Sequence, residues 1–231
     1  MVVFGCASVL LSYPGSSAQE FEKDLLSVED ALCRLSSSRA RDCLMDTRTW
    51  LASIPLEEAA AYYVSTFDLN DQHALHLTYH ALGDTRQRGM ALAALVDAYH
   101  EAGFQLVPGE LPDFLPALLE FAAVCEAGRK VLSQYRSVLQ TLYHRLEMAS
   151  NRYAKVLEAI GYAVGFGRFD RLTSSLRLKT AEPPIPPIEE VGLELLPTRG
   201  APGFPARPMQ PGNQFDSFPT PGTSVTSEDG S

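Results

Sequence analysis

Apolar residues recur at steps of three and four over roughly the first 162 residues, and this spacing restricts the fold more than any other feature of the chain. One such set is Phe21, Leu25, Val28 and Leu32. These positions share one face of a helix, whereas a half-buried strand needs an apolar residue at every second position. Long alternating runs and long β-branched runs are absent from the sequence. We therefore predict an all-α fold.

Proline, glycine and serine residues mark where the helices should begin and end. Pro14 and Gly15 stop the first helix, and Ser16 or Ser17 can cap the second. Gly103 can end a long helix near residue 101. After the first helix, we predict others over approximately residues 17–32, 39–52, 55–67, 74–82, 85–101, 112–124, 127–148 and 150–162. Their short connections favour a compact, bundle-like single domain.

The composition changes near Lys179, where proline and glycine become frequent. No helix or sheet tolerates that density of proline, so we predict a helical domain over residues 1–180 and a disordered tail over residues 181–231. The tail carries seven acidic and two basic side chains. Its segment 188–196 is both acidic and apolar, and could dock on the domain or on a partner.

The charge of the chain argues against nucleic-acid binding. The formal net charge is -9 and the isoelectric point is about 5.0, so no basic field is available to displace counterions from phosphates.

No uninterrupted apolar run approaches the ~20 residues that a membrane-spanning helix needs. The N-terminal residues also lack the basic region of a signal peptide. We therefore expect a cytoplasmic protein that does not insert into a membrane.

The sequence offers little catalytic or metal-binding chemistry. Its four cysteines form no C-x-x-C pair, and nucleophile-elbow, P-loop and dinucleotide-binding motifs are missing. His73, His76 and His80 would share one helical face, but no further ligand pattern accompanies them. We therefore expect no bound metal, no cofactor and no enzyme activity. A metal-dependent enzyme built on these histidines is the less favoured alternative.

Two arginines stand where the helix that ends near residue 101 should begin. Arg86 and Arg88 follow Gly83 and Asp84. Cations at a helix N-terminus oppose the helix dipole, so local helix propensity does not account for them. They either pair with surface carboxylates or anchor the wall of a binding groove.

The segment Glu110-Leu111-Pro112-Asp113-Phe114-Leu115-Pro116 places two prolines four residues apart around an aspartate. Helix-capping rules account for it, because Pro112 suits a first helical turn and Asp113 can accept hydrogen bonds from free backbone N–H groups. The prolines also stiffen the segment and fix the directions of Glu110 and Asp113, as a preformed recognition surface requires. Spacing alone leaves both interpretations open.

Four short segments follow one another in an order and spacing typical of a known family. They are Leu10-Leu11-Ser12-Tyr13-Pro14, Tyr63-Val64-Ser65-Thr66-Phe67-Asp68, Gly83-Asp84-Thr85-Arg86-Gln87-Arg88-Gly89 and the segment from Glu110 to Pro116. Together they resemble the motifs L-L-x-Y-P, Y-x-x-x-F-D, G-[DE]-S-R-x-R-G and E-L-P-D-x-L-P of the NarJ family of nitrate reductase assembly chaperones. The resemblance covers roughly residues 5–162 and excludes the tail.

The resemblance implies a helical chaperone that binds the N-terminal segment of the nitrate reductase catalytic (alpha) subunit, and we expect it to be a monomer. Such a chaperone holds the subunit competent for molybdenum cofactor insertion and delays its assembly at the membrane. The main alternative is a helical regulator or scaffold that binds its partner through the acidic tail.

We expect the client-peptide site to combine acidic and apolar residues of these segments. Glu110, Asp113 and Asp84 would meet the positive charge of an amphipathic, arginine-containing client peptide. An apolar floor would include Tyr63, Phe67, Leu115 and Leu119. The complete predicted set is Tyr63, Phe67, His80, Asp84, Arg86, Arg88, Glu110, Leu111, Pro112, Asp113, Leu115, Pro116 and Leu119.

Overall fold

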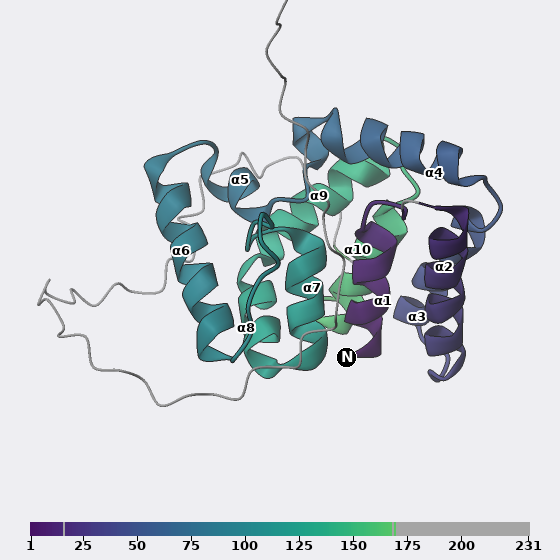
Figure 1. The fold of residues 1–231 in the computed structure, drawn as a ribbon, viewed down its shortest axis with the longest axis horizontal. Helices are drawn as coiled ribbons and strands as arrows, with labels where there is room; N and C mark the ends of the chain where they lie inside the picture. Colours follow the sequence, from purple (N-terminus) through teal and green to yellow (C-terminus); the bar gives the residue numbers. More distant parts are fainter. Residues whose placement is uncertain (16, 168, 170–231) are drawn as a thin grey trace, which may run out of the picture. The chain divides into compact units, whose positions relative to one another are not determined.

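The computed structural model describes residues 1–15, 17–167 and 169, and every regular element in these ranges is helical (Figure 1). The helices are α1 (Val2–Leu11), α2 (Ala18–Cys33), α3 (Arg39–Leu51), α4 (Leu56–Tyr63), α5 (Leu77–Leu82), α6 (Arg86–Glu101), α7 (Leu115–Val124), α8 (Glu126–Gln134), α9 (Arg136–Met148) and α10 (Ala154–Ala163). The predicted all-α class is confirmed. None of the described helices is long and apolar enough to cross a bilayer. The domain boundary expected near residue 180 and the segment 188–196 lie outside the described residues.

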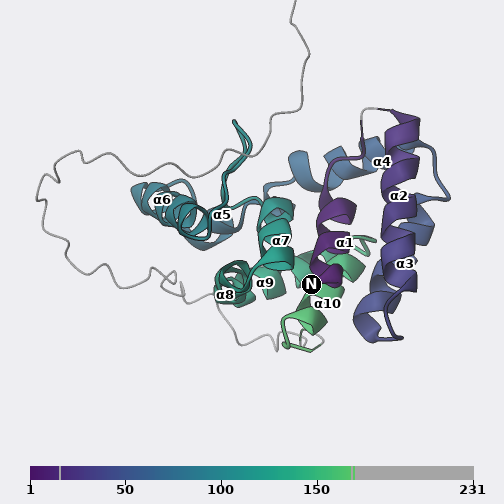
Figure 2. The same cartoon turned by 60° about the horizontal axis from the view of Figure 1, so that its bottom comes forward.

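Helix α1 is enclosed by other helices because it is apolar around most of its circumference. It packs against α2, α3, α7 and α10, and Figures 1 and 2 show α7 and α10 beside it. Gly5 faces Ala123 near the end of α7, whereas the hydroxyl of Ser8 donates a hydrogen bond to the carbonyl oxygen of Pro116 (2.9 Å) near its beginning. Helices α1 and α7 therefore run antiparallel, and the end of α1 meets the beginning of α7.

Serine side chains cap the two helices that follow α1. The hydroxyl of Ser17 accepts a hydrogen bond from the backbone N–H of Glu20 (3.2 Å) at the start of α2. Ser38 accepts one from Arg41 (3.3 Å) at the start of α3. Each cap satisfies an N–H group that a first helical turn leaves free. Of the two serines that the sequence offered as a cap for α2, Ser17 has this role.

The helix expected up to residue 67 changes its geometry before it ends. Helix α4 stops at Tyr63, and a π-helical turn covers Val64–Asp68. The wider turn leaves the adjacent residues Thr66 and Phe67 both buried. The hydroxyl of Thr66 accepts a hydrogen bond from the side-chain amide of Asn151 (2.9 Å), which ties the turn to the connection between α9 and α10.

The helix expected over residues 127–148 is in fact two helices. Tyr135, with a ψ of 19°, separates α8 from α9, and its side chain is buried. Apolar spacing continues across this corner, so periodicity alone did not reveal it. The helix expected from residue 112 also begins later, at Leu115, with Pro116 in its first turn. Pro112 precedes the helix instead of opening it.

Candidate functional site

Asp113 is the buried centre of the Glu110–Pro116 segment, with 0% of its surface exposed. Its carboxylate accepts hydrogen bonds from the backbone N–H of Thr78 (3.1 Å) and from the Thr78 hydroxyl (2.5 Å). The Nδ1 atom of His76 lies 3.2 Å from the other carboxylate oxygen. Asp113 therefore does not cap its own helix, as the sequence suggested, but joins the beginning of α7 to the beginning of α5.

Arg88 completes this buried group from α6. Its Nε atom donates a hydrogen bond to the Thr78 hydroxyl (3.2 Å), and its Nη2 atom lies 4.0 Å from the Asp113 carboxylate. The guanidinium carbon also lies 5.6 Å from the centre of the Tyr79 ring. Arg88 thus pairs with a buried carboxylate. The sequence had suggested either pairing with surface carboxylates or a place in the wall of a binding groove. Through Thr78 and Asp113 it connects the segment of residues 83–89 to the segment of residues 110–116.

Backbone hydrogen bonds fix the same junction. The N–H of Leu77 donates to the carbonyl oxygen of Asp113 (3.1 Å), and the N–H of Leu115 donates to that of Leu75 (2.8 Å). They flank an isolated antiparallel bridge between His76 and Phe114. Because main-chain and side-chain contacts both hold the segment, its position is strongly determined.

The pKa of Asp113 reflects these contacts. Burial by itself raises the pKa of a carboxyl group, because it disfavours the charged form. The hydrogen bonds from His76 and Thr78, together with the charge of His76, outweigh burial and hold the pKa of Asp113 below its ordinary value. Asp113 is therefore ionised at neutral pH and attracts Arg88.

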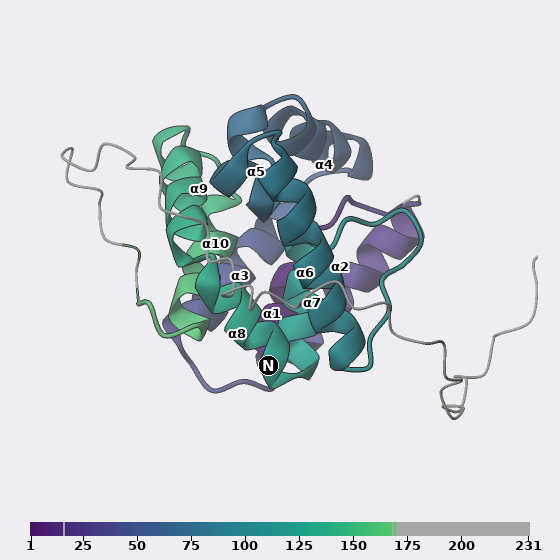
Figure 3. The same ribbon diagram turned by 90° about the vertical axis from the view of Figure 1, so that its left-hand side faces the viewer.

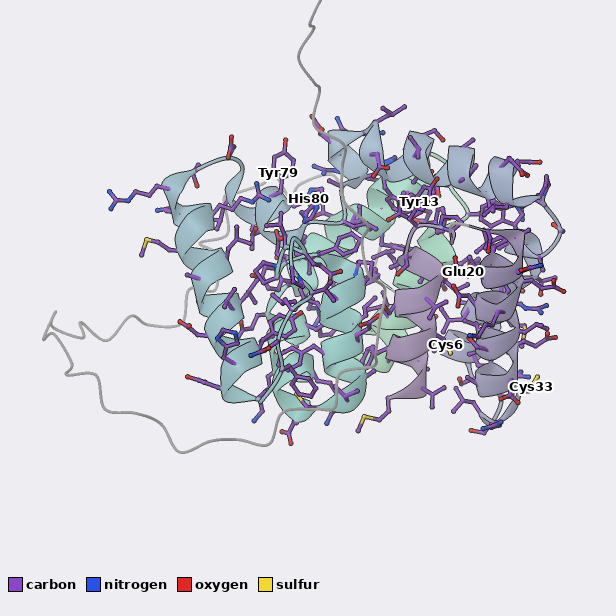
Figure 4. All side chains as sticks on the ribbon, in the orientation of Figure 1. Cys6, Tyr13, Glu20, Cys33, Tyr79 and His80 are labelled. Atoms are coloured by element: carbon purple, nitrogen blue, oxygen red, sulfur yellow. The ribbon has the colours of Figure 1, made fainter. Side chains whose placement is uncertain are left out.

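The three histidines considered for a metal site do not share a helical face. His73 ends a short 3-10 turn (Asp71–His73), and His76 precedes α5. The His80 Nε2 atom lies 2.6 Å from the carbonyl oxygen of Ala74, and its Nδ1 atom lies 3.3 Å from Arg145 Nη1. No group of three potential metal ligands occurs in the described ranges. His80 instead connects α5 to α9, and Figure 4 shows it next to Tyr79 on α5.

The remaining two motif segments meet near the same end of α7. The rings of Tyr13 and Tyr63 are edge to face, with centroids 5.5 Å apart, and Tyr63 packs on Phe67 at 5.0 Å. Both Tyr63 and Phe67 also contact the ring of Tyr153. The first segment thus contacts the second, and Ser8 links α1 to Pro116 in the fourth. Figure 3 views the fold from the side of α5 and α6.

The predicted site residues divide into a buried set and an accessible set. The buried set is Tyr63, Phe67, Pro112, Asp113, Leu115, Pro116 and Leu119. The accessible set, exposed or partly exposed, is His80, Asp84, Arg86, Arg88, Glu110 and Leu111.

A cavity of about 230 Å³ lies at the turn between α1 and α2, and another of about 650 Å³ lies near Trp50. Neither is lined by a residue of either set, so the expected apolar floor belongs to the packed core.

An acidic and apolar surface does occur beside the buried Asp113. Glu110 is partly buried and Leu111 is 40% exposed. Phe104 and Val107 are exposed in the same connection between α6 and α7. Burial and the negative charge of Glu120 both raise the pKa of Glu110. The fold therefore keeps two carboxylates that repel each other, and a bound cation would relieve this repulsion.

Sequence reasoning missed Thr78 and Glu120 and considered His76 only as a metal ligand. Thr78 is 35 residues away from Asp113 in the sequence, so only the tertiary fold brings the two together. Glu120 is one of several acidic residues on helices and has no local motif around it. No signal in this single sequence distinguished these residues.

Comparisons with known proteins agree with the motif pattern. A family model described as nitrate reductase delta subunit matches residues 20–158. The nitrate reductase-like protein NarX of Mycobacterium tuberculosis is 40% identical over 161 residues, which are 69% of this chain and 24% of that protein. The chain thus spans about a quarter of the length of NarX.

Two further relatives are matched over most of their length. The probable nitrate reductase molybdenum cofactor assembly chaperone NarJ of Bacillus subtilis is 34% identical over 161 residues, or 69% of this chain and 86% of that protein. The chaperone NarJ of Escherichia coli is 30% identical over 162 residues, or 69% and 68%. These names describe assembly proteins, in agreement with the expectation of a protein without catalytic chemistry.

Proposed function

Because the chain belongs to the nitrate reductase delta subunit family, we propose that it is a molybdenum cofactor assembly chaperone for nitrate reductase. It binds the N-terminal segment of the catalytic subunit in the cytoplasm, as a monomer and without a cofactor of its own. Binding keeps the subunit competent for molybdenum cofactor insertion before it attaches to the membrane.

The observation that carries this proposal is the position of Glu110 and Leu111 directly before the anchored Asp113. The two residues precede Pro112 and the buried Asp113, where contacts from α5 and α6 fix the chain. A basic amphipathic peptide would meet the charge of Glu110 and cover the exposed part of Leu111. Because Asp113 anchors the chain next to these residues, such a peptide would lose less affinity to ordering of the protein than on a free loop.

The other predicted residues take two parts in this proposal. Asp84 and Arg86 are exposed at the start of α6, and we assign them to the edge of the contact surface because they are close in sequence to Arg88. Tyr63, Phe67, Leu115 and Leu119 lie in the core, so they support the surface from beneath. Pro112, Asp113 and Pro116 give the segment its shape.

Replacing Glu110 by glutamine and Leu111 by alanine together should weaken binding of the client peptide about tenfold or more, since one attractive charge and one apolar contact are lost. Isothermal titration calorimetry with a synthetic peptide of the N-terminal sequence of the catalytic subunit measures this. The free energy of unfolding should change by only about 0.5 kcal/mol, because Glu110 is repelled by Glu120 and Leu111 is exposed.

A matched control is available at the opposite end of α7. Val124 is 63% exposed, and Glu126 is an exposed carboxylate that pairs only with the equally exposed Lys130 (3.3 Å) among the described residues. Val124→Ala with Glu126→Gln therefore also shortens one exposed aliphatic side chain and neutralises one carboxylate, away from the proposed surface. This variant should bind the peptide as the unchanged protein does. Equal affinity of both double variants and the unchanged protein would remove Glu110 and Leu111 from the site.

A further inference from the structure

The cavity of about 230 Å³ at the turn between α1 and α2 combines apolar walls with two carboxylates. Its walls include Leu10, Phe21 and Leu25, and its acidic residues are Asp24 and Glu120. A cavity of this size lies below the range of roughly 300–1,000 Å³ that holds drug-sized ligands. It has room for a single side chain. We name it the Tyr13 pocket, after the exposed tyrosine that also lines it.

The structure holds this pocket in a defined shape. Pro14 is buried, and a Cβ atom added to Gly15 would lie 3.0 Å from the Cβ atom of Glu20, so the turn packs closely on α2. Tyr13 is 55% exposed although its ring packs edge to face on Tyr63. Figure 4 shows Tyr13 and Glu20 where α1 is followed by α2. Pro14 and Gly15 therefore form a closely packed wall of the pocket.

The charges of the pocket are not balanced within the described part of the chain. Neither Asp24 nor Glu120 forms an ion pair with a described cation. Glu120 lies 3.2 Å from the Ser8 hydroxyl, whose one proton it shares with the nearer carbonyl oxygen of Pro116. Glu120 also acts on Glu110, whose pKa it raises. Glu110, Glu120 and Asp24 therefore form an acidic row that leads from the proposed peptide surface to the Tyr13 pocket.

Resting on the proposed function, we infer that the Tyr13 pocket receives an arginine side chain of the client peptide. The aliphatic stem of arginine can lie against Leu10, Phe21 and Leu25, while its charged end remains at the rim. There the guanidinium group can donate hydrogen bonds to Asp24 and Glu120 and stack on the exposed tyrosine ring. Lysine would keep the charge but lose the paired hydrogen bonds.

The test is a double-mutant cycle measured by calorimetry. The protein variant carries Asp24→Asn with Glu120→Gln, which keeps the shape of both side chains and removes their charge. The peptide variants replace each arginine of the client peptide in turn by glutamine. The protein variant should bind the unchanged peptide about tenfold more weakly. For one peptide variant, the same protein change should have almost no further effect, because both partners of one contact are already lost.

The control variant is Glu22→Gln with Glu101→Gln, which removes the same charge from exposed positions on α2 and α6 outside the pocket. It should retain the affinity of the unchanged protein to within about twofold, because salt screens exposed charges that make no contact with the ligand. The inference would be overturned if the pocket variant bound the peptide as tightly as the control variant does. It would also be overturned if the pocket variant weakened binding equally for the unchanged peptide and for every arginine-to-glutamine peptide. Either result would leave the proposed function intact. If the unchanged protein binds no client peptide, the proposed function itself fails.

Discussion

Asp113→Ala is expected to lower the free energy of unfolding by about 3–5 kcal/mol, because it removes one partner of a buried charged group and leaves the others unpaired. Arg88 would lose its counterion, and Thr78 would lose the acceptor for both its N–H and its hydroxyl. Urea unfolding followed by circular dichroism at pH 7 measures the change. Asp113→Asn should cost less, since the amide oxygen can still accept one of these hydrogen bonds. A loss below about 1 kcal/mol for the alanine variant would contradict the described role of this carboxylate.

The same contacts make stability depend on pH with a defined sign. The pKa of Asp113 in the folded protein lies below the value of 3.8 for a free aspartate. Its contribution is fully present above the pKa of the unfolded chain and is lost as the pH falls through the folded pKa. The unchanged protein should therefore lose stability more steeply than Asp113→Ala between about pH 5 and pH 2. Parallel curves for the two proteins would show that Asp113 makes no such contribution.

Gly128→Ala should destabilise the protein by about 3 kcal/mol, although alanine is the better helix former. An added Cβ atom would lie 2.4 Å from the carbonyl carbon of Phe121 and 2.6 Å from the backbone N of Ala122. These are backbone atoms of α7, so α8 would have to move away from α7 to accept the methyl group. Thermal unfolding followed by circular dichroism measures the loss.

Gly89→Ala on α6 is the matched control for this change. Gly89 is also inside a helix, but an added Cβ atom there meets nothing within 4 Å. Helix propensity then acts alone, and alanine should stabilise the protein by up to about 1 kcal/mol. The two substitutions should therefore shift stability in opposite directions. A stabilised Gly128→Ala variant would mean that α7 and α8 do not approach as closely as described.

Periodicity and helix caps were sufficient to predict the fold class and most of the helices. Apolar spacing located α2, α3 and α6, and Ser17 caps α2 as one of the two serines proposed. The corner at Tyr135 was missed because no proline or glycine marks it and apolar spacing continues through it. Tyr135 is buried at that corner, so the corner reflects tertiary packing and not local sequence.

The candidate site was predicted only in part for a related reason. The sequence marked Glu110, Asp113 and Arg88 as unusual, since each departs from what a simple helix requires. It did not show that Asp113 and Arg88 contact each other, because the link runs through Thr78, which no local rule distinguishes. Burial then divides the predicted residues into an accessible set, which in the proposed function contacts the peptide, and a buried set within the core.

The central claim is recognition of the N-terminal segment of the nitrate reductase catalytic subunit. Affinity capture tests it most directly. The full chain carries an affinity tag in cells that make the reductase under nitrate-respiring conditions, and the recovered proteins are identified by mass spectrometry. A parallel strain makes a catalytic subunit without its N-terminal segment, and a second chaperone variant ends at residue 180. We expect both chaperone forms to recover the intact subunit and neither to recover the truncated one. Recovery of the truncated subunit in equal amount, or loss of the intact subunit on removal of residues 181–231, would contradict this account.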